Sequence, residues 1–439
     1  MELLTFPHGI HPSDSKELTK ELPVNNMPVP KKVVIPMSQH IGAPATPLVE
    51  PGDYVKTGQK IGESSGFISA AIHSSITGKV TDISEQPTPI GNKSICITIE
   101  GDGKDEWIDI KKIDNYENCK PKELLEYISE AGIVGLGGAT FPTHVKLCPP
   151  ESKKIDTLII NSAECEPYLT CDYRIMIERT MDTIKGIRIM MKILGIEKAY
   201  IGIEANKPGA YNAYRKMLEN ETGIEPVMLQ TKYPQGAEKS LIKAILKREV
   251  PSGGLPMDCG VVVQNVGTAL AVYEACIKGK PLIERVLTVT GYGIRQPQNI
   301  MARIGVSFEE IINFCGGFVD VPGKIIMGGP MMGIAQYNVK SSMIKGTSGI
   351  LVMPKELVFE YEESPCLRCA KCVDVCPQFL LPSNLAKYSK KYMWDNSAQA
   401  GALDCVECGS CSYVCPSKIN IVQYIKLAKS EIAAIRKRK

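Results

Sequence analysis

Two short cysteine runs near the C-terminal end constrain this chain more than any other feature. Each has the form Cys-x2-Cys-x2-Cys-x3-Cys-Pro, and the runs start at Cys366 and Cys405. The start of the 439-residue chain has no basic stretch followed by an apolar one, so a secreted, disulfide-rich protein is disfavoured and metal binding in a reducing compartment is predicted. The candidate metal ligands are Cys366, Cys369, Cys372, Cys376, Cys405, Cys408, Cys411 and Cys415.

The repeated spacing resembles that of bacterial two-cluster ferredoxins, in which the fourth cysteine of each run ligates the cluster of the other run. This rule predicts two [4Fe–4S] clusters with crossed ligands. Zinc sites and disulfides are the alternatives, but zinc needs only four ligands per ion, usually from paired Cys-x2-Cys units. The predicted ligand sets are Cys366, Cys369, Cys372 and Cys415 for one cluster, and Cys405, Cys408, Cys411 and Cys376 for the other.

Helices are predicted on both sides of the second cysteine run. One is expected over residues 384–394, with Ser383 or Asn384 as its cap, and another after Pro416, through Ile421 and Ala428. This pattern predicts a helical, two-cluster ferredoxin-like domain over residues 355–439.

The N-terminal quarter has a different pattern. Residues 32–105 contain short apolar segments separated by glycine and proline, which indicates strands. The segments VEPGDYVKTGQKIG and SSITGKV resemble the barrel-sandwich fold of biotinyl and lipoyl carriers, and residues 1–31 form an extension before it. Carriers of this fold have a lysine at the tip of a hairpin, where the cofactor is attached. In this chain that position falls near Phe67, so carrier chemistry is disfavoured and a structural or docking role is predicted.

Residues 119–279 alternate between helical and strand patterns, which predicts an α/β domain with a mainly parallel sheet. Such a sheet binds ligands at the carboxyl ends of its strands. The predicted helices cover residues 121–132, 172–194, 208–221 and 235–248, and the predicted strands cover 156–163, 198–205, 225–231 and 259–266.

A glycine-rich stretch, GIVGLGGATFPTHVK at residues 132–146, interrupts this domain. Backbone amides freed by several glycines can approach a phosphate, and Lys146 adds a positive charge. A simple tight turn is the alternative, because no strand precedes the stretch and the G-x-G-x-x-G dinucleotide pattern is absent.

The glycine-rich stretch and the later NSAECEP segment together resemble the flavin-binding signature of the NADH-oxidising subunit of respiratory complex I. The segments YPQGAEKSLIKAI and VVVQNVGTAL are similar to further parts of that subunit, and ERVLTVTGYG begins a β-grasp module like the one that follows there. With the barrel and the two-cluster domain added, nearly the whole chain resembles the C subunits of Rnf complexes, which are membrane-bound, ion-translocating ferredoxin:NAD oxidoreductases.

The resemblance implies a multidomain chain of α/β and α+β class. Its expected parts are the extension (1–31), the barrel-sandwich domain (32–105), a complex I-type FMN/NADH-binding α/β domain (119–279), a soluble-ligand-binding β-grasp domain (280–350) and the helical dicluster domain (355–439).

The resemblance also implies the site residues. The FMN phosphate and ribityl chain are expected at Gly135, Gly137, Gly138 and Lys146, and the isoalloxazine near Asn161 and Glu164, with Gly236 and Asn265 also binding the cofactor. Phe141, Glu166 and Glu238 are expected to face NADH, and Glu164 and Glu166 are the catalytic candidates.

Some of these residues have simpler interpretations, and the chain departs from the complex I pattern. The two glutamates could be solvated carboxylates and Asn265 a turn residue, while Cys165 and Cys171 fit buried thiols better than ligands. Val134 and Leu136 stand where the complex I pattern has arginines, and Ala163 where it has aspartate, which leaves the dinucleotide contacts less defined.

The implied function is hydride exchange between NAD(H) and FMN, followed by single-electron transfer through two [4Fe–4S] clusters. The implied partners are other subunits of the membrane complex, including an iron–sulfur, ferredoxin-like subunit, and no nucleic acid. The chain is expected at the cytoplasmic face of the cell membrane as a peripheral subunit without a transmembrane segment. A cobalamin reductase-like flavin/iron–sulfur protein and an electron-relay adaptor without nucleotide chemistry are the alternatives.

Charge is distributed unevenly along the chain. Residues 366–439 hold 12 Lys/Arg and 5 Asp/Glu, a net charge of +7, although the chain as a whole carries only +3. This segment is predicted to dock on an acidic electron-transfer partner or on an anionic membrane surface. A solvated basic tail is the alternative.

Overall fold

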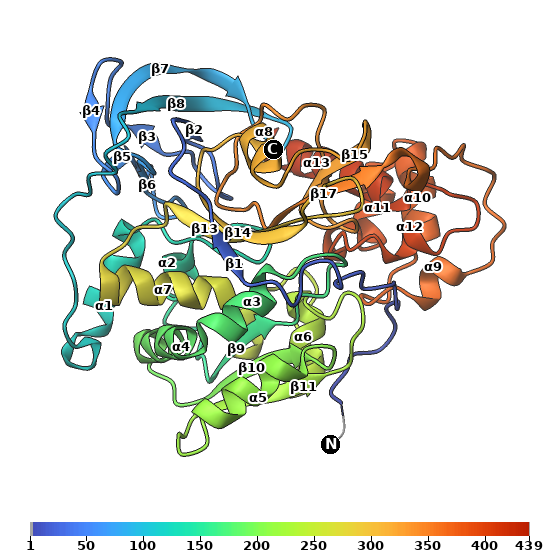
Figure 1. The fold of residues 1–439 in the computed structure, drawn as a ribbon. Helices are drawn as coiled ribbons and strands as arrows, with labels where there is room; N and C mark the ends of the chain where they lie inside the picture. The colour runs from blue at the N-terminus through green and yellow to red at the C-terminus, as the bar shows by residue number, and fades with distance from the viewer. Residues whose placement is uncertain (1–2, 439) are drawn as a thin grey trace.

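The structure is a computed structural model that describes residues 3–438. The N-terminal barrel (blue) lies above a central six-stranded sheet, the α/β domain (green) lies below it, and the cysteine-rich helices (red) pack at one side (Figure 1). Among the described helices, none is both long enough and apolar enough to cross a membrane.

The barrel consists of two small antiparallel sheets around an apolar core. Alternate residues of its longer strands, such as Val33, Ile35, Ile97 and Ile99, point inward and are fully buried. The first sheet has the order β2-β8-β7-β4, with β2 (Lys32–Pro36), β4 (Tyr54–Val55), β7 (Gly78–Pro87) and β8 (Lys93–Gly101). The second contains β3 (Thr46–Pro47), β5 (Lys60–Glu63) and β6 (Ile72–His73).

The loop between β5 and β6 docks on the α/β domain. The Phe67 carbonyl lies 3.1 Å from His144 Nε2, and the Phe67 ring contacts the His144 ring edge-on. The position that a carrier would use for its lysine therefore forms a contact between domains.

The α/β domain has four parallel strands in the order β11-β10-β9-β12, as the alternating pattern predicted. The strands are β9 (Thr157–Ser162), β10 (Ala199–Glu204), β11 (Ile224–Leu229) and β12 (Val261–Asn265). The helices are α1 (Pro121–Glu130), α2 (Thr143–Lys146), α3 (Cys171–Glu178), α4 (Thr180–Leu194), α5 (Pro208–Met217), α6 (Glu238–Leu246) and α7 (Val266–Lys278), with 3-10 turns η1 (Tyr116–Asn118) and η2 (Pro256–Cys259).

The single helix predicted over residues 172–194 is wrong, because the chain breaks into α3 and α4 at Arg179. Arg179 has φ −130° and ψ 31°, and its guanidinium binds Asp182 and Glu274. No glycine or proline marks the break, so the tertiary ion pair with Glu274 could not be anticipated from the local pattern.

The central sheet has the order β1-β14-β13-β17-β15-β16 and includes a strand from the N-terminal extension. This strand, β1 (Val24–Asn26), pairs in parallel with β14 and was not predicted. The other elements are β13 (Glu284–Thr290), β14 (Gln298–Arg303), α8 (Phe308–Phe314), β15 (Pro322–Met327), β16 (Ile334–Ala335), β17 (Gly349–Pro354) and η3 (Lys355–Leu357).

The C-terminal part that the structure describes is helical, as predicted. It contains α9 (Lys371–Asp374), α10 (Pro382–Lys390), α11 (Trp394–Gln399), η4 (Ala402–Asp404), α12 (Ser410–Tyr413) and α13 (Ile421–Arg438). The boundaries predicted for residues 384–394 are wrong: the helix begins at Pro382 after Leu381 and ends at Lys390. Proline suits the first turn of a helix because its φ is already helical and its missing N–H is not needed there, so no Ser383 or Asn384 cap is required.

Candidate functional site

Asn161 and Asn265 lie side by side at the carboxyl ends of β9 and β12, paired directly in the sheet register. The chain runs from β9 to β10 and β11 on one side of β9, and then crosses back to β12 on the other side. Such a reversal leaves a crevice at the strand ends, which is where open α/β sheets bind ligands.

The glycine-rich loop lies beside these strand ends. The Gly135 amide donates to the Phe141 carbonyl at 2.9 Å, so these two residues close the loop at its base. Gly137 and Gly138 lie exposed at its tip. A Cβ on Gly137 would lie 2.9 Å from Asn265, whereas a Cβ on Gly138, which has φ +153°, would meet nothing within 4 Å. Glycine therefore allows both the close approach to Asn265 and the open backbone at the tip.

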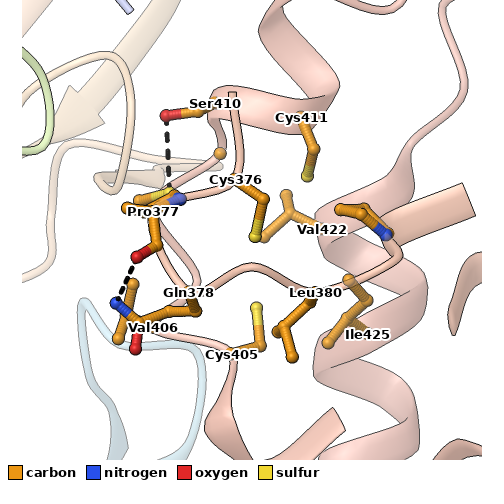
Figure 2. A pocket seen from close by; sticks show the side chains of 13 residues that line it. Cys376, Pro377, Gln378, Leu380, Cys405, Val406, Ser410, Cys411, Val422 and Ile425 are labelled. Carbon is orange, nitrogen blue, oxygen red and sulfur yellow. Dashed lines mark hydrogen bonds between the residues drawn. The ribbon is translucent and has the colours of Figure 1, made fainter. Parts of the chain in front are cut away.

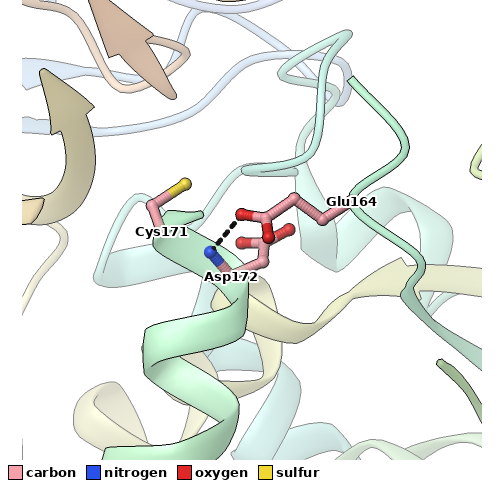
Figure 3. A group of neighbouring side chains, drawn as sticks. All are labelled: Glu164, Cys171 and Asp172. Atoms are coloured by element: carbon pink, nitrogen blue, oxygen red, sulfur yellow. Dashed lines mark hydrogen bonds between the residues drawn. The ribbon is translucent and has the colours of Figure 1, made fainter. Parts of the chain in front are cut away.

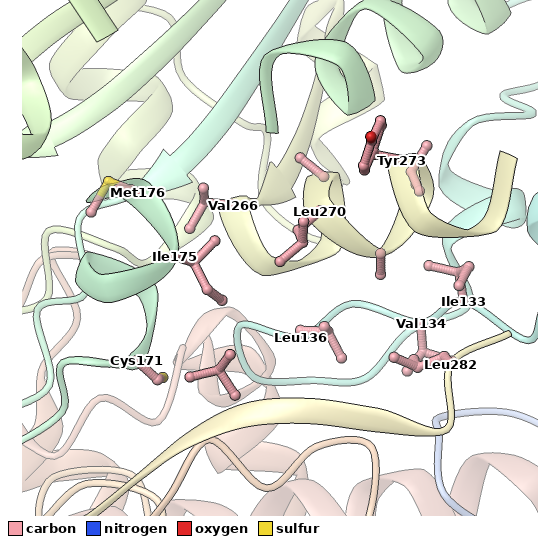
Figure 4. Packing of buried hydrophobic residues seen from close by; sticks show 14 of the residues in the cluster. Ile133, Val134, Leu136, Cys171, Ile175, Met176, Val266, Leu270, Tyr273 and Leu282 are labelled. Atoms are coloured by element: carbon pink, nitrogen blue, oxygen red, sulfur yellow. The ribbon is translucent and has the colours of Figure 1, made fainter. Parts of the chain in front are cut away.

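Val134 and Leu136 point to the other side of this loop, into the apolar core between α7 and β13 (Figure 4). Beneath the loop, the buried Arg285 of β13 donates to the Leu136 carbonyl at 3.2 Å. The two positions that carry arginine in the complex I pattern therefore serve packing here, and an arginine from the central sheet supports the loop backbone.

Lys146 lies at the end of α2, where its ammonium contacts the Glu238 carboxylate and donates to the Val263 carbonyl at 3.1 Å. Asn161 Nδ2 donates to the Gly236 carbonyl at 2.7 Å. The structure thus brings together four predicted residues from α2, β9 and the start of α6.

These residues fit FMN in their chemistry. A lysine ammonium and exposed glycine amides are each suited to a phosphate. Next to Gly236, the carboxamide of Gln235 is fully buried and has no partner on either polar atom among residues 3–438, and the Ser240 hydroxyl on α6 is also unpaired. Buried polar atoms are seldom left unpaired, so these groups indicate a polar ligand or water at this position.

Glu164 caps helix α3. Its two carboxylate oxygens accept from the amides of Asp172 (2.7 Å) and Tyr173 (3.3 Å), as Figure 3 shows for Asp172. Burial raises the pKa of Glu164 to about 7. The neighbouring Asp172 carboxylate accepts from Asn265 Nδ2 at 2.6 Å. The carboxylates of Glu164 and Asp172, next to the buried Cys171, therefore both have hydrogen-bond partners within the protein.

Glu166 binds the central sheet's GGPMMG segment, residues 328–333. Its carboxylate accepts from the amides of Met331 (3.1 Å) and Met332 (2.8 Å), and burial raises its pKa. A Cβ on Gly329 would lie 2.2 Å from Glu166 Oε2, so glycine is required at that position. The structure places Glu166 at a domain contact, and its role towards NADH stays a prediction.

Four cysteines from both runs line one cavity in the C-terminal domain. Cys376 comes from the first run, and Cys405, Cys408 and Cys411 come from the second. Figure 2 shows the sulfurs of Cys376, Cys405 and Cys411 directed towards the same space. Burial raises the pKa of the Cys405 thiol to about 11, so a bound cation is needed to keep it a thiolate at neutral pH.

The other four cysteines of the two runs do not line this cavity, and two of them are open to solvent. Cys366 and Cys369 are exposed, whereas Cys372 and Cys415 are buried. Ser417 Oγ donates to the Pro365 carbonyl at 2.9 Å, which holds the end of the second run beside the start of the first.

Tyr233 joins the α/β domain to the second cysteine run. Its side chain is 1% exposed, and its hydroxyl donates to the Cys408 carbonyl at 2.8 Å. Tyr233, Cys408 and Ile10 form one buried apolar cluster. Neither Tyr233 nor Arg285 was predicted from the sequence, and the only local signal for Tyr233 was its place in the YPQGAEK segment.

Comparisons with known proteins show the family to which this chain belongs. The chain is 52% identical to the C subunit of the proton-translocating ferredoxin:NAD(+) oxidoreductase complex of Clostridium ljungdahlii, over 98% of this chain and 94% of that one. It is 50% identical to the Na(+)-translocating counterpart of Acetobacterium woodii, over 99% and 98%. This chain belongs to the RnfC family.

Domain families match in the order that the RnfC resemblance implied. They are the RnfC barrel sandwich hybrid domain (residues 4–104), the Nuo51 FMN-binding domain (128–274), the SLBB domain (286–335) and the 4Fe-4S dicluster domain (359–429). FMN and [4Fe–4S] clusters are the cofactors of an RnfC chain with these domains, and the other subunits of the ion-translocating complex are its partners.

The fold also resembles a solved structure of an NAD+-reducing [NiFe]-hydrogenase in the air-oxidised state. The TM-score is 0.52 at 17% identity, over 74% of this chain and 67% of that one. At this identity the likeness concerns the fold alone.

Proposed function

We propose that this RnfC chain exchanges hydride between NAD(H) and FMN and passes single electrons through two [4Fe–4S] clusters to another subunit. Bound flavin supplies the step between two-electron and one-electron chemistry. The residues of the chain supply the placement of the cofactors.

Lys146 and the amides of Gly137 and Gly138 are proposed to hold the FMN phosphate. Asn161 and Asn265, at the crevice between β9 and β12, are proposed to bind the flavin. Phe141, in the glycine-rich loop, and Glu238, at the start of α6, are proposed to contact the dinucleotide.

The contact between Tyr233 and Cys408 carries the proposal. It brings the cavity of Cys376, Cys405, Cys408 and Cys411 against the segment that also carries Gly236 and Glu238. This cavity is proposed to hold the proximal cluster, which receives electrons from the flavin. The set with the exposed Cys366 and Cys369 is proposed to hold the distal cluster, from which electrons leave.

Anaerobic reduction by NADH distinguishes this function from that of an electron-relay adaptor without flavin. The reconstituted chain should release FMN on acid precipitation, and NADH should bleach first the flavin and then the cluster absorption. A chain that releases no flavin, and whose clusters NADH does not reduce, would be an adaptor.

The basic C-terminal helix is proposed to dock on the membrane complex, at the cytoplasmic face. Helix α13 ends in Arg436, Lys437 and Arg438. Deleting residues 436–439 is expected to weaken association with the complex and to make it more sensitive to salt, because exposed charges are screened. NADH oxidation with an artificial acceptor at the flavin should be unchanged. Equal association across a salt series would place the docking surface elsewhere.

A further inference from the structure

Lys16, in the N-terminal extension, reaches into the loop that follows β9. Its side chain is 4% exposed. Its ammonium donates to the carbonyls of Glu164 (3.0 Å), Glu166 (2.9 Å) and Leu169 (2.5 Å). An ammonium has three donors, so the backbone of residues 164–169 uses all of them.

This loop has a shape that its own sequence does not favour. Glu164 has φ +48° and Tyr168 has φ +68°, a left-handed conformation that costs energy for residues with a Cβ. Such a loop keeps its shape when the surrounding contacts fix it. At its beginning, Lys207 of the α/β domain donates to the Ala163 carbonyl at 2.6 Å, and Lys16 fixes the rest from outside the domain.

Neighbouring contacts hold the extension in place along the same loop. The Tyr168 amide donates to the Asp14 carbonyl at 2.8 Å, and the hydroxyls of Thr19 and Thr170 lie 2.7 Å apart. Burial lowers the pKa of Lys16, with a further contribution from the charge of Lys207. Burying an ammonium is unfavourable unless it is fully hydrogen-bonded, as it is here.

We infer that Lys16 is a positioning residue for the flavin site: it holds residues 164–169, which carry Glu164 and Glu166, in the conformation that FMN binding requires. This inference rests on the proposed function, because it assigns FMN to the crevice beside this loop. It makes the N-terminal extension a part of the site rather than a separate appendage.

The test is Lys16→Met in the full-length chain, because methionine keeps the apolar length of the side chain and removes its donors. Without FMN, amide hydrogen exchange of residues 164–170 should become faster. The dissociation constant for FMN, measured by fluorescence well below the melting temperature, should rise about tenfold or more, because a smaller fraction of the chains would hold the loop in the conformation that binds FMN. The absorption spectrum of the bound flavin should also change, whereas the iron content should not.

Lys20→Met is the matched control, because Lys20 lies in the same extension with a side chain 44% exposed. It should leave loop exchange and FMN affinity unchanged. Lys16→Arg keeps the charge but not the geometry of the donors, and should weaken FMN binding less than Lys16→Met. If Lys16→Met does not fold, the FMN affinity and the loop hydrogen exchange of Lys16→Arg are compared with those of the wild type instead.

The inference would be overturned if Lys16→Met and Lys16→Arg both bound FMN as tightly as the wild type and showed wild-type rates of amide hydrogen exchange in residues 164–170. Failure of the wild-type chain to bind FMN would instead refute the proposed function. In that case, hydrogen exchange without FMN still shows whether Lys16 fixes the loop.

Discussion

Replacing Cys376 by serine is expected to remove the same [4Fe–4S] cluster as replacing Cys411, although the two residues belong to different runs. The reason is that Cys376 lines one cavity with Cys405, Cys408 and Cys411. Each variant should fall from about eight iron atoms per chain to about four, because each [4Fe–4S] cluster contains four iron atoms. Iron and sulfide analysis gives the number, and EPR of the reduced protein identifies which cluster remains.

The complementary pair is Cys372→Ser and Cys415→Ser, which should both lose the other cluster. Cys148→Ser is the control, because Cys148 is exposed and lies outside the runs. Loss of the same EPR signal in Cys376→Ser and Cys372→Ser would contradict the crossed ligands.

The two pairs of variants should also differ in electron transfer. Without the proximal cluster, NADH should reduce the flavin but not the remaining cluster. The reason is that Tyr233 connects the flavin domain with the proximal cavity, which in these variants has lost its cluster. Without the distal cluster, NADH should still reduce the proximal one. Stopped-flow absorption separates the two results, and rapid reduction of the distal cluster in Cys411→Ser would refute the proposed order.

Lys146→Ala is expected to weaken FMN binding by about tenfold to a hundredfold, the range for a charge-assisted hydrogen bond to phosphate. Riboflavin, which lacks the phosphate, should bind wild type and variant with similar affinity. Fluorescence titration of both ligands gives the comparison, and Lys154→Ala, at an exposed position, is the control.

The comparison between FMN and riboflavin distinguishes a phosphate contact from a structural role. An equal loss for both ligands would mean that Lys146 supports the loop through Glu238 and Val263 without binding phosphate. No loss for either ligand would remove Lys146 from the site and weaken the assignment of the glycine-rich loop.

Much of the fold could be predicted because it depends on local signals. Local sequence patterns located the four strands of the α/β sheet to within a few residues, and they indicated strands over residues 32–105, where the barrel lies. Where a distant group decides the local structure, prediction failed: Arg179 breaks the helix over residues 172–194 while binding Glu274, and Val24–Asn26 becomes a strand because β14 is its neighbour.

The candidate site divides in the same way. The spacing of the two cysteine runs predicted the cluster ligands, and the glycine-rich stretch indicated a phosphate site. Both predictions were possible because ligand number and backbone freedom depend on residue type and spacing. The sequence could not show that Val134 and Leu136 face the core, that Glu166 binds the amides of Met331 and Met332, or that Tyr233 contacts Cys408.

Residue type and short-range spacing were therefore enough to predict the cysteine ligands and most secondary structure, whereas the family and FMN were implied by the resemblance of whole segments to a known family. The packing of the domains was needed to show which cluster site faces the flavin domain and which residues support its loops. Lys16 is separated from Glu164 by 148 positions, and Tyr233 from Cys408 by 175. Contacts over such separations form only when the domains pack together, and no local pattern records them.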